Sequence, residues 1–260
     1  MQNKRKRTIL ILVLVFLPYA SLLILSSGSG WSFPRLFPDR IDFAPWRTAW
    51  SGRYTLLMAS LNTVVMSIVI SLASTSLGLI SGRALKRQES MLLLFVVYLP
   101  FVLSPVIVGT VLYDIESRLG IVSSILGVLI AQFMFAYAFA TVFFYELWDS
   151  RIQRLEQLVQ TLGGDSRTVW RHAILPSASG LIAVCLIQTS IFVWLDYGLV
   201  SALGGGNVPT VTLLLFSYLR EASINQASQA AIVLLVGSVL ACLTSAFILK
   251  RTRRRVGEQL

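Results

Sequence analysis

The stretch that decides the fold is the longest polar interval in a chain made mostly of apolar runs. It reads Glu156-Gln-Leu-Val-Gln-Thr-Leu-Gly-Gly-Asp-Ser-Arg-Thr-Val-Trp-Arg-His-Ala-Ile-Leu-Pro176. The pair Gly163-Gly164 predicts a helix end, because glycine takes a left-handed cap conformation at little cost. Asp165 and Ser166 are favoured N-cap residues. We therefore predict a helix, a glycine turn and a short amphipathic helix, whose apolar side carries Val169, Trp170 and Ala173.

Two interpretations of this stretch remain open from its spacing. A helix–turn–helix held at a membrane surface can dock a soluble partner. Helices that end at glycine are also common in loops that only connect two spans. Ile174-Leu175-Pro176 leads directly into the next apolar run.

The composition indicates an integral membrane protein. A soluble domain carries roughly 25% charged residues, whereas this chain of 260 residues has 13%, with 55% hydrophobic residues and a mean hydropathy of +0.74. Cys185 and Cys242 both fall in apolar runs and are expected to be core residues. His172 is the only histidine, so we expect no metal site built from histidines.

Six apolar stretches are long enough to span a bilayer, which needs about 20 helical residues. They cover approximately residues 8–26, 57–80, 91–113, 121–145, 178–199 and 229–249. The first is interpreted as an uncleaved signal-anchor, because it exceeds the apolar core of a signal peptide, which is about 7–15 residues. We predict an all-α membrane protein with six transmembrane helices. Its parts are an N-terminal region 1–56, a core domain 57–249 containing the segment 150–177, and a basic tail 250–260.

The basic residues predict the orientation. Sixteen of the 22 lysines and arginines lie on one side of the predicted spans, and such an excess marks the cytoplasmic side. Both termini and the 150–177 segment are therefore expected in the cytoplasm. The formal net charge of +10 is a topology signal, so the expected partner is the lipid bilayer and not nucleic acid. On the outer side, a short amphipathic helix is predicted over Trp46–Arg53.

Polar and helix-breaking residues mark candidates for a substrate pathway. Asn62, near the outer end of the second span, suits either a route or a hydrogen bond between helices. Pro100 and Pro105 interrupt the third span, as a pathway-lining break or a fixed kink. Asp196 is the only ionisable residue well inside a predicted span, and is either functional or a solvated helix end.

Gly163, followed thirteen residues later by the end of Ile174-Leu175-Pro176, resembles the "EAA…G…I.LP" loop of binding-protein-dependent ABC importer permeases. In that family the loop forms a coupling helix that docks into the ATPase subunit. The family's Glu-Ala-Ala falls here on Gln157, Leu158 and Val159, and Glu156 lies one position before the family's acid. The resemblance implies ATPase-coupling roles for Gln157, Leu158, Val159, Gly163, Gly164, Asp165, Ser166, Val169, Trp170, Ile174 and Pro176.

The same resemblance, which extends from Leu61-Asn62-Thr63 to about residue 249, implies a type I, MetI-like permease in a bacterial inner membrane. Its expected partners are ABC ATPase subunits, a second permease subunit and an extracytoplasmic solute-binding protein that sits against the 201–228 loop. ATP and magnesium would be bound by the ATPase, and this chain has no Walker motif, so no cofactor and no catalytic residue is expected in it.

The segment after the fifth span is similar to permeases of the polyamine, iron(III), phosphonate and thiamine group, although it has one acid, Asp196, where that group shows two. The residues expected along the substrate pathway are Asn62, Pro105, Trp194, Asp196 and Tyr197.

Two alternatives belong to other classes. A secondary, ion-coupled transporter would need buried ionisable residues, and Asp196 is the one candidate. An intramembrane enzyme would need a nucleophile–base pair or paired acids at a shared depth, and the sequence places no such set in its spans.

Overall fold

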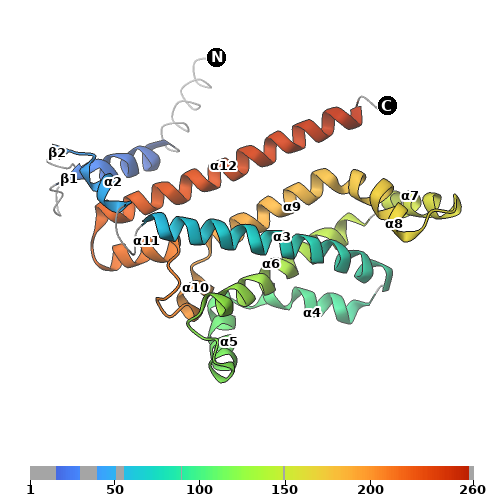
Figure 1. Cartoon of the computed structure of the whole chain (residues 1–260), viewed down its shortest axis with the longest axis horizontal. Helices are drawn as coiled ribbons and strands as arrows, with labels where there is room; N and C mark the ends of the chain where they lie inside the picture. Colours follow the sequence, from blue (N-terminus) through green and yellow to red (C-terminus); the bar gives the residue numbers. More distant parts are fainter. Residues whose placement is uncertain (1–15, 30–39, 51–55, 89, 149, 258–260) are drawn as a thin grey trace, which may run out of the picture. The chain divides into compact units, whose positions relative to one another are not determined.

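The computed structural model of the full chain describes residues 16–29, 40–50, 56–88, 90–148 and 150–257. These residues are helical through most of their length. The one strand pairing among them is the two-residue ladder of β1 (Gly28–Ser29) and β2 (Arg40–Ile41). The expected all-α architecture is therefore confirmed (Figure 1). The chain divides into two compact units, Met1–Thr63 with Pro209–Gly237 and Val64–Val208 with Ser238–Leu260.

Four described helices are long and apolar enough to cross a membrane. They are α3 (Leu56–Gln88), α6 (Ile125–Leu147), α9 (Leu175–Leu195) and the Ile224–Ile248 part of α12 (Ile224–Gly257). The pair α4 (Met91–Val102) and α5 (Pro105–Leu119) makes a fifth if it counts as one broken span. The first predicted span begins outside the described residues, and its described part is the apolar helix Phe16–Ser27. The number six stays a prediction.

The third predicted span is interrupted, as its prolines predict, but the interruption lies at Pro105 and not at Pro100. The axes of α4 and α5 differ in direction by 102°. Pro100 lies inside α4 without ending it. The break comes before Pro105, because the residue preceding a proline favours the extended conformation, and Ser104 has φ −63° and ψ 137°. Pro105 then begins α5, where its missing N–H is tolerated.

The first unit is held together by polar side chains near the ends of its helices. Asn225 Nδ2 donates to the carbonyl oxygens of Leu25, Ser26 and Gly28 at 2.8–3.0 Å. This ties the start of α12 to the end of the helix Phe16–Ser27. Helix α11 (Val211–Arg220) begins at Thr210, whose hydroxyl accepts from the Leu213 N–H. On the outer segment, α2 covers Ala44–Ala49, so the predicted helix over Trp46–Arg53 starts earlier than expected, and residues 51–55 lie outside the described residues.

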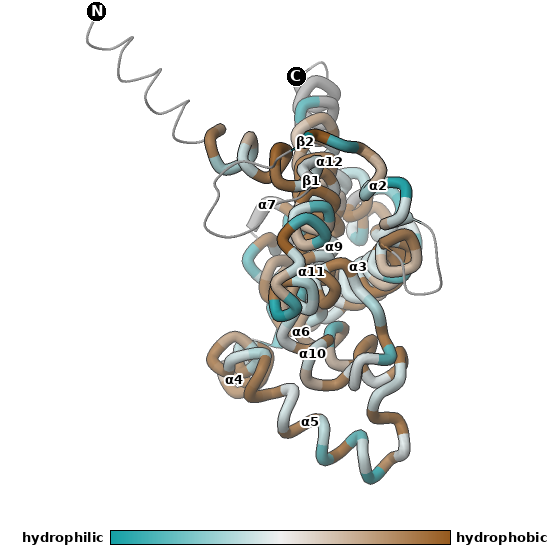
Figure 2. Tube along the Cα trace, turned by 90° about the vertical axis from the view of Figure 1, so that its left-hand side faces the viewer, coloured by the Kyte–Doolittle hydropathy of each residue, from teal (hydrophilic) through white to brown (hydrophobic). Residues whose placement is uncertain are grey.

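The second unit packs α6 at its centre, against α4, α5, α9 and α10 (Gly198–Leu203). Close approach of α3 to α6 depends on Gly78, where an added Cβ would lie 2.5 Å from Ala140 Cβ. Helix α4 has no charged residue and no buried residue, and it is mostly brown in Figure 2. Within this unit, Figure 1 shows α7 and α8 at one end of the helix pair α6 and α9. Helix α10 lies at the other end of that pair.

Candidate functional site

The 150–177 segment has the helix–turn–helix form that its sequence predicts. Helix α7 covers Ser150–Thr161, and Gly163 follows it with φ +81°. The Gly163 N–H donates to Gln160 O at 3.0 Å and the Gly164 N–H to Val159 O at 2.9 Å. These two bonds form a Schellman motif, which satisfies carbonyl groups that the helix end would leave free. Two nearby residues lie outside the described residues: residue 149, just before the 150–177 segment, and residue 89, just after α3.

The second helix begins at the predicted cap. Asp165 Oδ1 accepts from the Thr168 N–H at 2.9 Å and from the Thr168 hydroxyl at 2.5 Å, at the start of α8 (Ser166–Thr168). These hydrogen bonds, the hydroxyl's first, hold the pKa of the Asp165 carboxyl below its ordinary value, because they stabilise the charged form. The aspartate therefore acts as an ionised N-cap at neutral pH.

The predicted short helix does not stop before the next span, which corrects the sequence analysis. It continues through the π-helix η1 (Val169–Ile174) into α9. The Leu175 N–H donates to Trp170 O, five residues back, so the helix widens by one residue just before Pro176. A wider turn suits this position, since proline has no N–H to donate to the usual carbonyl.

The residues expected to couple to an ATPase fall into two sets. The exposed set is Gln157, Leu158, Gly163, Asp165, Ser166 and Pro176, and the half-buried set is Val159, Gly164 and Trp170. Val169 and Ile174 are 0% and 1% exposed. These last two pack in the core cluster with Leu79, Ala140, Phe144, Trp148 and Cys185. Their side chains are therefore anchors of the segment and are not part of its surface.

One exposed residue at the turn was missed by sequence analysis. Leu162 is 79% exposed, beside Leu158 at 56%, and both lie on the α7 side of the glycine turn. The signal was present, because the segment has two leucines four residues apart immediately before Gly163, and residues four apart share one helix face. The tip of the segment thus carries an exposed apolar pair.

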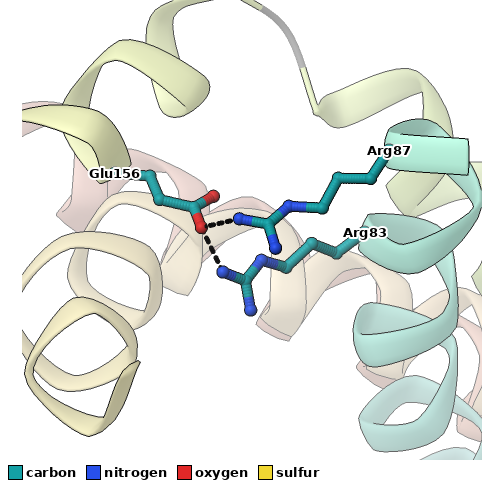
Figure 3. A network of polar contacts seen from close by, with 3 residues as sticks. All are labelled: Arg83, Arg87 and Glu156. Carbon is teal, nitrogen blue, oxygen red and sulfur yellow. Dashed lines mark hydrogen bonds and ion pairs between the residues drawn. The ribbon is translucent and has the colours of Figure 1, made fainter. Parts of the chain in front are cut away.

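Glu156 is the second feature that the sequence did not reveal. It is only 4% exposed, and its Oε1 accepts from the guanidinium groups of Arg83 and Arg87 on α3. Figure 3 shows both arginine side chains reaching from α3 toward the same carboxylate oxygen. The Arg83 guanidinium also lies over the rings of Trp170 and Trp148, 5.1 and 5.9 Å from their centroids.

Asp196 is buried, so the interpretation as a solvated helix end is wrong. It is 9% exposed and forms the C-cap of α9. Its carboxylate accepts from Gln132 Nε2 of α6 at 2.8 Å and from the Leu199 N–H at the start of α10 at 3.3 Å. The side chain therefore joins three helices of the second unit.

The other pathway candidates have different surroundings. Asn62 is half-buried, and its amide donates to Pro209 O at 3.2 Å. This favours its interpretation as a packing contact, here between α3 and the loop before α11. Trp194 and Tyr197 are half-buried. Pro105 lines a cavity of about 460 Å³ between α4, α6 and α9, whose lining includes Gln188 and Thr189 among mostly apolar side chains.

A second buried acid, Glu116, lies just outside the predicted limits of the third span. Helix α5 runs six residues beyond the predicted limit at 113, to Leu119, and it contains Glu116, which is 3% exposed. Gly127 makes room for it, because a Cβ on Gly127 would collide with the Glu116 carboxylate. No pattern in the sequence distinguishes this acid from its exposed neighbour Asp114.

The chain has four or five apolar helices that can span a membrane, and a structured segment between α6 and α9 is anchored in the core of the second unit. These features define a multi-pass membrane protein. Residues 74–258 match the family model described as "Binding-protein-dependent transport system inner membrane component", and the chain belongs to this family, that of the MetI-like ABC permeases. The predicted family is confirmed. The protein is therefore a permease component of a binding-protein-dependent ABC transporter in the inner membrane, and not a catalytic component. Among curated proteins, none matches the chain.

Proposed function

We propose that this chain is the membrane-spanning subunit of an ATP-driven importer, and that an ABC ATPase docks on the 150–177 segment. The observation that carries the proposal is the division of that segment into anchors and tip. Val169 and Ile174 are buried in the core of the second unit, while Leu158 and Leu162 are exposed beside the glycine turn. An exposed apolar pair on a fixed support suits a docking surface.

The remaining assignments are proposed from the family of the chain and from the distribution of its basic residues. ATP and magnesium are bound by the ATPase, and this chain supplies no cofactor site. A second permease subunit, identical or paralogous, completes the pathway. A solute-binding protein delivers the substrate on the outer side, against the 201–228 loop, and both termini lie in the cytoplasm. The movement is a rigid-body switch between inward-open and outward-open states.

For the substrate we propose a small solute of the polyamine, iron(III), phosphonate or thiamine group. The cavity beside Pro105 has no acidic residue in its lining, and Asp196 is engaged with Gln132 and Leu199. Neither favours a polycation over the other members of the group. The binding protein is expected to select the substrate.

The test is purification of the tagged chain in mild detergent, with mass spectrometry of the proteins that co-purify. We expect an ABC ATPase with the wild-type chain. Leu162→Glu should lose the ATPase, because it places a charge in the docking surface. Leu119→Glu changes a similarly exposed leucine, 67% exposed in α5, and should retain it.

Two outcomes would contradict the proposal. A wild-type chain that purifies without any ATPase would favour an ion-coupled carrier and direct attention to Asp196. A Leu162→Glu chain that retains the ATPase as well as Leu119→Glu does would show that the partner docks elsewhere.

A further inference from the structure

The ion-pair network of Glu156 connects two helices that are far apart in the sequence. Arg83 and Arg87 lie on the last turns of α3, 73 and 69 residues before Glu156. Since they are four residues apart, they project from one face of that helix. Both bind one carboxylate oxygen on α7 (Figure 3). The carboxylate thus clamps two successive turns of α3.

Glu156 and the next residue, Gln157, differ in burial. Glu156 is 4% exposed, whereas Gln157, in the position of the family's acid, is exposed. Successive residues on a helix point about 100° apart, so α7 turns one of them inward and the other outward. An ionised carboxylate is kept in such a place only when it is paired and hydrogen-bonded. The Glu156 carboxylate therefore faces its own chain.

Arg83 extends the network to two more elements. Its side chain is 16% exposed, and its guanidinium lies over Trp170 of η1 and over Trp148, the C-cap of α6. A guanidinium is planar and permanently charged, so it can pair with a carboxylate while it stacks on an aromatic ring. Through Arg83 the end of α3 contacts both halves of the helix–turn–helix, α7 and η1.

We propose that Glu156 is a positioning residue for energy coupling: it locks the 150–177 segment to the end of α3, so that the segment and α3 move as one body. The proposal rests on the proposed function, because the ATPase is the source of the movement. When docking displaces the tip at Leu162, the displacement reaches α3 through the Glu156–Arg83–Arg87 clamp. Glu156 itself makes no contact with the ATPase.

The first test uses the full chain alone in lipid nanodiscs. Spin labels on Gln88→Cys and Gln160→Cys, both at exposed positions, report the distance between the end of α3 and α7. The exposed Cys242 is replaced by serine. We expect a narrow distance distribution in the wild-type background and loss of that narrow peak in Glu156→Gln. The matched control is Glu146→Gln, an exposed glutamate at the end of α6, which should keep it.

Two further variants keep the test decisive if Glu156→Gln folds poorly. Arg87→Gln changes a side chain that is 57% exposed, so it should fold, and it should broaden the peak in part. Reversal of the charges, with Glu156→Arg, Arg83→Glu and Arg87→Glu together, should restore the narrow peak that Glu156→Arg alone loses. Rescue by reversed charges would show that pairing between α7 and α3, and not the shape of the glutamate side chain, holds the two helices together.

The second test uses the complex with the co-purified ATPase. Glu156→Gln should retain the ATPase and its hydrolysis, but lose the nucleotide-dependent shift between labels on Gln88→Cys and Leu119→Cys. Loss of ATPase binding in this variant would show that Glu156 docks the partner, and would overturn the proposal. An unchanged shift, or a wild-type peak in the first test, would overturn it as well. If the wild-type chain binds no ATPase, the proposed function fails, and the first test still decides the clamp.

Discussion

Gly163 is the residue whose conformation shapes the tip of the 150–177 segment. Its φ of +81° lies in the left-handed region, which costs an L-residue with a side chain roughly 1–2 kcal/mol. Space is not the constraint, because a Cβ there would meet no atom within 4 Å. The glycine is therefore required for its backbone and not for close packing.

Gly163→Ala should leave the fold intact, but the alanine disfavours the left-handed conformation of the turn that docking needs. If re-forming that conformation costs about 1.4 kcal/mol, ATPase binding weakens about tenfold. Binding of the purified ATPase to the variant in nanodiscs measures this. Gly206→Ala is the control, because Gly206 has φ +78° and is equally open. Gly206→Ala should lower the free energy of unfolding by a similar amount and keep the wild-type affinity for the ATPase. If both variants weaken ATPase binding equally, the role of the Gly163 turn is refuted.

At the scale of elements, the break between α4 and α5 determines where α5 packs. The axes of the two helices differ by 102°, and α5 lies against α10. The two helices approach closely at Gly109, where an added Cβ would lie 2.8 Å from Ala202 Cβ and 3.8 Å from Leu199 Cδ2. Asp196 supports the same joint, because it accepts the Leu199 N–H at the start of α10.

Gly109→Ala should lower the free energy of unfolding by about 1–3 kcal/mol, the usual cost of an extra group in a packed core. Adding Ala202→Gly should recover most of this loss, leaving about 0.5–1 kcal/mol for a glycine in a helix. Thermal unfolding of the four proteins of this cycle in one detergent gives the values. A double variant no more stable than Gly109→Ala would contradict the packing of α5 on α10.

At the scale of the whole molecule, the distribution of charge and apolar length determines the relation to the membrane. Sixteen of 22 basic residues lie on one side of the predicted spans, and translocation of such clusters is unfavourable. The apolar helices of this chain have the length that a hydrocarbon core of about 30 Å requires. The charge distribution predicts the orientation and the apolar length predicts the spans, and neither prediction depends on how the helices pack.

A fluorescent protein fused after Leu260 should therefore fluoresce in cells, because it folds in the cytoplasm, and alkaline phosphatase at the same position should be inactive. Phosphatase fused after Gly205, in the loop between α10 and α11, should be active. An active phosphatase at Leu260 would reverse the predicted orientation and would place the 150–177 segment away from any cytoplasmic ATPase.

The local features of the 150–177 segment were predictable from the sequence. The helix end at Gly163-Gly164 and the N-cap at Asp165 follow from backbone preferences and from hydrogen bonds within four residues. The family was predictable for the same reason, since the glycine and the Ile-Leu-Pro ending keep their spacing along the chain. The existence of four apolar spans depends on composition alone, because transfer into lipid is governed by the side chains of each run.

Only the tertiary structure decided which side chains of the segment face inward. Glu156 and Gln157 are neighbours of similar size, and the arginines that distinguish them lie about 70 residues earlier, at the end of α3. The burial of Val169 and Ile174, the contacts of Asp196 and the place of Glu116 likewise depend on residues of other helices. Local sequence determines backbone conformation and membrane length, whereas burial and pairing depend on contacts that exist only when distant helices have packed.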